Sequence, residues 1–284
     1  MRVGVISKGS PDYLIDVVTD GLIRLLGRHN VSLDYNVRGS VGGSYVHLCQ
    51  GFEGPEPFNI FEADVLVASN RSIETMRKWR REAGAVKPIA FIDGEDHDVI
   101  DSCVLEEVSV YFKREYLKGR TYPAMVRPLP FGAIPELIPP VSSKDIPFSF
   151  MADVTHEYRH EIFRGLRVPS LPVKLPKADY NRNLAQSMIG VSVRGMGWDT
   201  YRYWEVPYFG ALLLSQRLQT VIPGDFKDGQ EAVFFDDVTS LPGVVEGLLA
   251  DPPRLAEIAQ AGHLACVTRH LSVHRATTAL EALL

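Results

Sequence analysis

The sequence predicts an α/β protein with two open, parallel β-sheets, one in each half of the chain. Short apolar segments alternate with amphipathic helical segments in the first half, and the alternation begins again in the second half. A proline-rich segment, residues 128–147, separates them and holds six of the 19 prolines. The length of 284 residues and the 45% of hydrophobic residues suit two domains, each with its own core.

The first half opens with a strand-like segment, residues 2–7 (RVGVIS), followed by a turn and a helix over residues 14–29. The helix is predicted from apolar residues at helical spacing, namely Leu14, Val17, Val18, Leu22 and Leu25. Two buried strands follow, at residues 62–70 and 87–93. The charged helix between them, residues 72–84, is expected to carry Trp79 at its surface.

The second half contains three apolar segments that we interpret as strands, at residues 148–153, 187–193 and 211–215. Helices are predicted after the first two strands, and a closing helical stretch is divided at the Pro252-Pro253 pair; their ranges are 156–166, 199–209 and 241–270. In open α/β sheets, ligands bind beyond the carboxyl ends of the strands. Candidate site residues are therefore those that directly follow a strand.

Charge and cysteine content restrict the function classes. A formal net charge of −5 provides no broad basic surface for nucleic acid or an anionic membrane. The three cysteines (Cys49, Cys103 and Cys266) are far apart and lack metal-ligand spacing, which favours reduced thiols over disulfides. No stretch approaches the roughly 20 apolar residues of a membrane span, and the N-terminal apolar run is too short for a signal peptide. We expect a soluble cytoplasmic protein.

A glycine turn follows the strand at residues 187–193 and leads into the helix at residues 199–209. Its glycines are Gly195 and Gly197, and Asp199 or Thr200 is expected to cap the helix through its side chain. A diphosphate could dock near Gly197 and Thr200, because free amides and the helix dipole favour an anion there. Asp199 would repel that anion unless it faces away or pairs with a cation such as Arg202.

Three charged residues are candidates for contacts with the same ligand. Arg202 and Glu205 lie three positions apart on one helix face, and a carboxylate there can accept two hydrogen bonds from a ribose cis-diol. The alternative is a surface ion pair between the two residues. Arg159 is placed either to bind a diphosphate as a fork of donors or to lie at the surface.

The first half offers a titratable loop after the strand at residues 87–93: Asp93, Glu95, Asp96 and His97. This loop could supply the general base for an acceptor hydroxyl, bind a metal, or be a solvated acidic turn.

Other candidates have equally plain alternatives. Gly9 and Ser10 could approach an acceptor or form an ordinary turn. Lys113 and Arg114 could face a ligand or begin a charged helix. His156 and His160 have metal-compatible spacing without a third ligand nearby.

The second half resembles a known family over residues 148–284. The resemblance rests on three segments in order: residues 195–214 (GMGWDTYRYWEVPYFGALLL), 221–237 (VIPGDFKDGQEAVFFDD) and 248–275 (LLADPPRLAEIAQAGHLACVTRHLSVHR). It is similar to nucleotide-sugar glycosyltransferases with the two-Rossmann-domain GT-B fold, with the family 1-like C-terminal domain. The group that includes the CgeB-like spore-maturation proteins is the most similar.

This resemblance implies two Rossmann-like domains whose parallel sheets face across a cleft. Residues 1–135 would form the acceptor-side domain and residues 148–268 the donor domain, with a final helix in residues 269–284 that packs back on the first domain. Glu205 would bind the donor ribose. Many relatives carry a second acidic residue eight positions earlier, where this chain has Gly197, so a retaining or inverting outcome is left open.

The function implied is transfer of a sugar from a nucleoside diphosphate to an acceptor, without a metal or other cofactor. The acceptor could be a glycan, lipid, protein, small metabolite or modified nucleobase. Two alternatives share the scaffold: a non-catalytic protein that binds a nucleotide or glycan, and a nucleotide-sugar epimerase.

Overall fold

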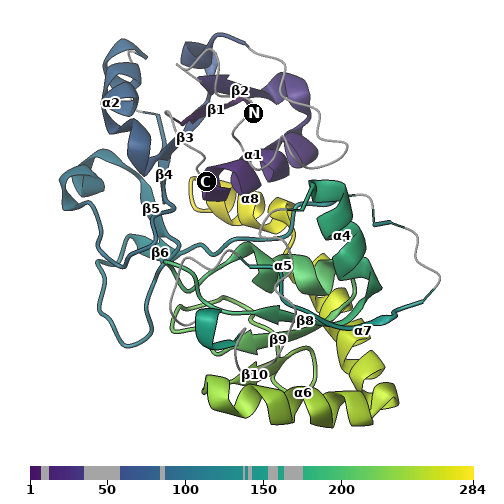
Figure 1. The fold of residues 1–284 in the computed structure, drawn as a ribbon. Coiled ribbons are helices and arrows are strands. Elements are labelled where there is room, and N and C mark those ends of the chain that lie inside the picture. Colours follow the sequence, from purple (N-terminus) through teal and green to yellow (C-terminus); the bar gives the residue numbers. More distant parts are fainter. Residues whose placement is uncertain are drawn as a thin grey trace. The chain divides into compact units, whose positions relative to one another are not determined.

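The computed structural model describes residues 1–7, 13–34, 58–83, 87–136, 138–139, 143–152, 159–162 and 175–284. The chain divides into two compact units (Figure 1). Unit 1 comprises Met1–Glu136, Thr220–Pro223 and Leu271–Leu284, and unit 2 comprises Leu137–Gln219 and Gly224–His270.

Within the described residues, unit 1 contains a six-stranded sheet in the order β2-β1-β3-β4-β5-β6, and every pair of neighbours is parallel. Its strands are β1 (Val3–Ile6), β2 (Val31–Asp34), β3 (Val65–Ser69), β4 (Ile89–Asp93), β5 (Val110–Lys113) and β6 (Val126–Pro128). The predicted strands at residues 2–7, 62–70 and 87–93 are confirmed as β1, β3 and β4, which are apolar because both faces of the sheet are covered.

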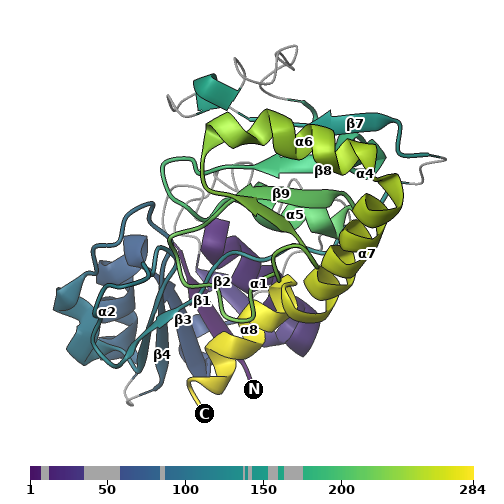
Figure 2. The same ribbon diagram turned by 90° about the horizontal axis from the view of Figure 1, so that it is seen from below.

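Helices cover both faces of this sheet. They are α1 (Tyr13–Leu26), α2 (Ile73–Glu82) and α8 (Ser272–Glu281), with the short 3-10 helices η1 (Arg28–Asn30), η4 (Ile60–Glu62), η5 (Asn70–Ser72) and η6 (Ser102–Glu107). Figure 2 shows α2 on one side of the strands and α1 with α8 on the other.

The surface position expected for Trp79 is wrong. Trp79 is 2% exposed and packs with Met76 in the core between α2 and the sheet, and its indole N–H donates to the carbonyl of Ile60 at 3.1 Å. Residues three apart lie on one face of a helix. The otherwise charged α2 therefore presents a narrow apolar face to the strands.

The final helix packs closely on α1. A Cβ atom on Gly21 would lie 2.2 Å from the carbonyl oxygen of Ser272, so only glycine fits at this crossing. The Ser272 hydroxyl donates to Asp20 Oδ2 at 2.5 Å. Arg275 Nε donates to the carbonyl oxygens of Pro130 and Phe131, at 3.1 and 2.7 Å. These bonds join α8 to the start of the proline-rich segment.

That segment is therefore not a free linker along its whole length. Leu129, Phe131, Ala133 and Ile134 are buried in unit 1, and the boundary between the units falls after Glu136. Residues 129–136 form no helix or strand, as expected for this proline content, but the apolar side chains between the prolines are buried.

Unit 2 contains, in the part of the chain described, a parallel four-stranded sheet in the order β10-β9-β8-β7. Its strands are β7 (Ile146–Ser149), β8 (Ser187–Ser192), β9 (Leu212–Gln216) and β10 (Val233–Phe235). Its helices are α4 (Lys177–Gln186), α5 (Tyr201–Tyr208), α6 (Leu241–Ala250) and α7 (Pro252–Arg269), with the 3-10 helix η7 (Val238–Ser240) and a helical segment at residues 159–162. The division of the closing stretch at Pro252-Pro253 is confirmed.

The end of α5 positions β9. Pro207 lies in the last turn of the helix, and Gly210 follows with a φ of 78°. Ala211 N–H donates to Val206 O and Gly210 N–H to Pro207 O, which together form a Schellman motif. This glycine stop turns the chain directly into β9.

None of the helices that the structure describes is long and apolar enough to cross a bilayer.

We predict that Gly21→Ala destabilises unit 1. The new methyl group would collide with helix backbone, and overpacking of this kind costs about 1–3 kcal/mol, more than the gain of about 1 kcal/mol from replacing a helical glycine. Hydrogen exchange of the β1 and β3 amides should report faster opening. Gly247→Ala in α6 is the matched control, because nothing lies within 4 Å of its added Cβ. Equal protection in both variants would contradict the prediction.

Candidate functional site

The turn after β8 is covered by an arginine. Gly195 N–H donates to Gly197 O at 2.9 Å, which closes the turn. A Cβ atom on Gly195 would lie 2.8 Å from Arg159 Nη2, and Arg159 Nε donates to the carbonyl of Arg194 at 3.2 Å. Arg159 is buried, so the surface alternative is wrong. The structure brings its guanidinium and the glycine turn together.

The N-cap residue of α5, Thr200, makes no side-chain cap. Thr200 is the N-cap residue, but its hydroxyl lies 3.1 Å from Ser192 Oγ and makes no capping bond. The buried Asp199 accepts a hydrogen bond from the Trp204 indole at 2.8 Å. Both side chains thus stabilise the turn and the helix core, and the cap expected from the Thr200 side chain is wrong.

Arg202 lies on the same helix but does not form the ion pair considered from its spacing. Its Nη1 donates to the carbonyl of Met151, which follows β7. Its Nε is buried and lacks a hydrogen-bond partner among the described residues. Arg202 therefore links α5 to the end of a neighbouring strand and retains one donor.

Glu205 forms the centre of a polar cluster with Lys177 and Tyr180 of α4. The carboxylate is 6% exposed. Lys177 Nζ lies 2.7 Å from Oε1, and the Tyr180 hydroxyl donates to Oε2 at 2.6 Å. The Lys177 ammonium also lies 5.2 Å from the centre of the Tyr180 ring. Two side chains of α4 thus converge on one carboxylate of α5.

Burial raises the pKa of Glu205 to about 8. The ammonium of Lys177 acts in the opposite direction, because a cation at this distance favours the charged carboxylate.

Sequence reasoning missed Lys177 and Tyr180 because it assigned no element to residues 177–186. A signal was available: each parallel strand needs a crossover connection before it, usually a helix. The segment directly before the strand at residues 187–193 was the place for one, and the first turn of such a helix lies at the carboxyl edge of the sheet.

The aromatic residues around Arg202 and Glu205 are core. Tyr203 and Trp204 are fully buried, and the Tyr203 hydroxyl donates to Asp225. His270 packs on the Trp204 ring with centroids 5.1 Å apart. The opposite faces of α5 thus have different roles: rings fill the core, and the two charged side chains reach polar partners.

In unit 1, the structure encloses Asp93. Its Oδ2 accepts from Lys113 Nζ at 2.8 Å and from the Tyr111 hydroxyl at 2.5 Å, while Oδ1 accepts from Glu95 N–H at 3.1 Å. Lys113 is the last residue of β5 and is 0% exposed, so it does not begin a helix. Burial lowers the pKa of Lys113 and raises that of Tyr111.

The other residues of this loop are more accessible. Glu95 accepts from Arg71 Nε at 3.0 Å, and this bond lowers its pKa. Asp96 is exposed and pairs with Arg114, while His97 is exposed. The solvated acidic turn therefore describes Asp96 and His97 but not Asp93.

The structure describes few contacts of the remaining candidates, which are the proposed metal ligands and the residues of the turn after β1. Among the residues that the structure describes, no group of three His, Cys, Asp or Glu side chains could hold a metal ion. His160 is exposed on its helical segment. Gly9, Ser10 and His156 lie outside the described residues.

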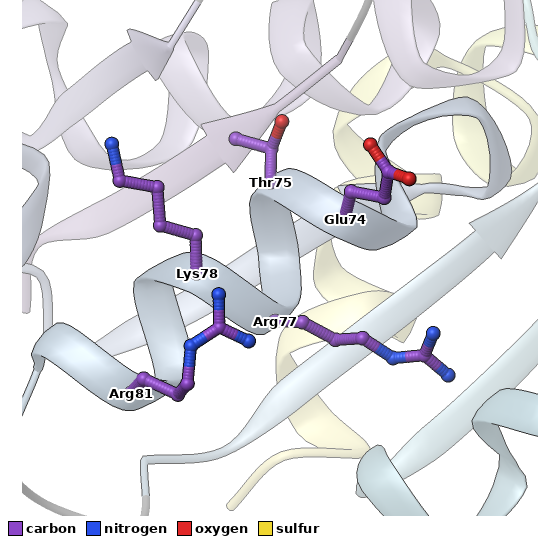
Figure 3. A pocket seen from close by; sticks show the side chains of 5 residues that line it. All are labelled: Glu74, Thr75, Arg77, Lys78 and Arg81. Atoms are coloured by element: carbon purple, nitrogen blue, oxygen red, sulfur yellow. The ribbon is translucent and has the colours of Figure 1, made fainter.

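A hollow of roughly 400 Å³ lies on the outer side of α2 (Figure 3). All five labelled side chains come from α2, and Arg77 and Lys78 point in opposite directions. Arg77 is bound by Glu107, with Nη2 2.5 Å from Oε1. Because Glu107 precedes β5, this hollow is not at the carboxyl ends of the strands, where the candidate residues lie.

Several solved structures are similar to this chain in fold. HepE from Anabaena in complex with UDP-glucose is similar, with a TM-score of 0.66 and 11% identity over 100% of this chain and 99% of that one. Sucrose-phosphate synthase from Thermosynechococcus elongatus has a TM-score of 0.61 and 9% identity over 99% and 98%. The lipopolysaccharide outer core galactosyltransferase WaaB has a TM-score of 0.58 and 10% identity over all of both chains. No curated protein matches the sequence.

A family model described as glycosyl transferase-like matches residues 137–281, just over half of the chain. The match covers β7, the glycine turn, Glu205 and its partners on α4. The predicted α/β class and GT-B fold are confirmed by the two parallel sheets and these neighbours. The chain therefore belongs to the glycosyl transferase-like family and is a glycosyltransferase with the GT-B fold.

Proposed function

We propose that this enzyme takes its sugar from a nucleoside-diphosphate donor bound by unit 2, with Glu205 as the ribose-binding residue. The observation that carries the proposal is the buried carboxylate of Glu205 on α5, the helix that follows the glycine turn. Two donors from α4, Lys177 and Tyr180, bond to this carboxylate. A buried carboxylate is costly unless it serves as an acceptor. HepE, which shares the fold, was solved with UDP-glucose, so we propose a uridine nucleotide as the first candidate.

The diphosphate would lie at the turn after β8. The first turn of α5 lacks a side-chain cap, and the Arg159 guanidinium lies against Gly195. Backbone amides and a guanidinium fork are the groups that bind phosphate oxygens. The backbone amides of Gly197 and Thr200 would donate to the phosphate oxygens, and so would Arg202 Nε, which has no hydrogen-bond partner among the described residues. Asp199 is buried and accepts a hydrogen bond from the Trp204 indole, which turns its carboxylate toward the helix core.

The acceptor side remains a proposal on unit 1. Of the loop residues, Glu95, Asp96 and His97 are accessible enough to receive a proton from an acceptor hydroxyl, whereas Asp93 is enclosed. Gly9 and Ser10 stay predictions for acceptor contact. Metal independence and a cytoplasmic location, both implied at the level of sequence, belong to the same proposal.

A second candidate is a protein that binds the nucleotide but transfers nothing. Gly197 favours it, because many relatives carry a sugar-side acidic residue at that position and this chain has no side chain there. A panel of nucleotide sugars, with release of nucleoside diphosphate as the readout, separates the two. Turnover with any donor supports transfer, and tight nucleotide binding without turnover across the panel supports the second candidate.

Glu205→Gln should weaken binding of UDP by about 1–3 kcal/mol, the range for losing hydrogen bonds to a charged acceptor. Isothermal titration calorimetry measures this directly. Glu257→Gln is the matched control, since that exposed carboxylate on α7 pairs only with Arg254 in the described contacts. Unchanged affinity in a folded Glu205→Gln protein would remove Glu205 from the site.

Asp93→Asn should lower the free energy of unfolding by about 3–5 kcal/mol, because it leaves the Lys113 ammonium buried without its counter-charge. The double variant Asp93→Asn, Lys113→Met should recover part of this loss. Urea denaturation checks both. If the single variant is as stable as the parent, the bonds of Asp93 to Lys113 and Tyr111 have no structural role. Asp93 would then again be a candidate for the catalytic base.

For the accessible loop residues, kinetics give the test. At least one of Glu95→Gln, Asp96→Asn and His97→Ala should lower kcat while leaving the donor KM nearly unchanged, as expected for a group that acts on the acceptor. Asp98→Asn, in the same loop and paired with Arg120, serves as the control. Full kcat in all three variants would exclude the loop as the source of the base.

A further inference from the structure

We propose that Arg194 recognises a carboxylate on the donor sugar, so that the preferred donor of this enzyme is a nucleoside-diphosphate uronic acid. The inference rests on the proposed function, because it needs the donor nucleotide at the turn after β8. It adds a specificity residue to that site and names the class of sugar.

The guanidinium of Arg194, which directly follows the buried end of β8, is held by an aromatic ring. Its central carbon lies 4.6 Å from the centre of the Trp198 ring. Stacking uses the flat face of a guanidinium and leaves its N–H edges for acceptors in the plane. Arg194 Nε is buried without a hydrogen-bond partner among the described residues. In that part of the chain no carboxylate pairs with Arg194.

Other stacked arginines of this protein pair with an acid. Arg217, which follows β9, has its central carbon 5.4 Å from the centre of the Phe234 ring. It also pairs with Asp228 and Asp236, at 2.9 and 3.0 Å. A ring and a carboxylate are likewise combined at Arg2, Arg114 and Arg120. Within the described residues Arg194 has the ring alone, and the missing carboxylate is a group that a ligand can supply.

A second donor comes from the neighbouring strand. Gln216 is the last residue of β9 and is 6% exposed, and its Oε1 accepts from the backbone N–H of Arg194 at 3.3 Å. This bond fixes the amide oxygen, so the other end of the amide, Nε2, is a donor. Nε2 donates to none of the residues that the structure describes. A guanidinium fork with an amide beside it suits the two oxygens of a carboxylate.

The order of groups in the donor brings its sugar to these side chains. In the proposed function the ribose is at Glu205 and the diphosphate is at the start of α5. Glu205 lies four residues after Tyr201, the first residue of the helix, which is about 6 Å along the axis. The diphosphate joins the ribose to the sugar, so the sugar should lie beyond the helix start, at residues 194–198. Gly195 and Gly197 have no side chains there, which leaves room beside Arg194.

UDP-glucose and UDP-glucuronic acid test this inference, because they differ at one carbon of the sugar: a CH₂OH group in the first and a carboxylate in the second. Isothermal titration calorimetry with both, and with UDP, isolates the effect of the carboxylate. Wild type should bind UDP-glucuronic acid about tenfold or more tightly than UDP-glucose, the effect of hydrogen bonds to a charged group. Arg194→Met should bring this ratio to about one and change the affinity for UDP by less than about twofold.

Two further variants test the geometry without removing the side chain of Arg194 altogether. Arg194→Lys keeps the charge but loses the fork, so it should retain only part of the ratio. Gln216→Glu keeps an acceptor for the Arg194 N–H and puts a negative charge in place of Nε2, so it should lower the ratio several-fold. Arg217→Met is the matched control, since that stacked arginine already has its acids and should leave the ratio unchanged.

The outcomes separate the two proposals. If UDP does not bind to wild type, the uridine donor site is wrong and the inference falls with it. If UDP binds but wild type does not prefer UDP-glucuronic acid, the sugar carboxylate is wrong and the proposed function stands. A preference that survives in full in Arg194→Met would assign it to another cation. An equal loss of affinity for all three ligands in that variant would place the guanidinium on the diphosphate, which also contradicts the inference.

Discussion

A carboxylate taken out of water must find donors, and in unit 2 this requirement ties two helices together. Glu205 on α5 is bonded by Lys177 and Tyr180 from the first turn of α4. Helices that connect parallel strands begin at the carboxyl edge of the sheet, so the two helix starts meet where a ligand binds in this class of fold. The glycine turn after β8 and the Arg159 guanidinium that lies against it are at this same edge.

Unit 1 contains a related cluster with a different outcome. Asp93 is also bonded by a lysine and a tyrosine, Lys113 and Tyr111. There the lysine has no exposure and a backbone amide takes the other carboxylate oxygen, so the cluster is closed. Around Glu205 the lysine is partly exposed. A carboxylate, a lysine and a tyrosine thus form a closed cluster in unit 1 and a partly exposed one in unit 2.

Much of the fold was predictable because long apolar runs in a parallel sheet are unmistakable. The segments that became β1, β3, β4, β8 and β9 are of this kind, and the Pro252-Pro253 pair correctly divided α6 from α7. Short or polar elements were missed, among them β2, β6 and β10. Trp79 was placed at the surface because the charges of α2 outnumber its apolar residues, although spacing three apart was enough to bury one face.

The candidate site was predictable in its position but not in its contacts. The glycine turn and the helix with Glu205 were found from the sequence, and the family match supports the class of reaction. Which side chain Glu205 would meet could not be known, since Lys177 is 28 residues away and on a helix that was not predicted. Asp199 illustrates the same limit: spacing suggested a cap, and the indole of Trp204 took its carboxylate instead.

A crystal structure of the protein with UDP would show directly whether the donor nucleotide binds unit 2 through Glu205. Both ribose hydroxyls should lie within hydrogen-bonding distance of the Glu205 carboxylate, about 2.5–3.0 Å between oxygens. A nucleotide held by other residues, with no ribose hydroxyl near Glu205, would rule out this binding mode.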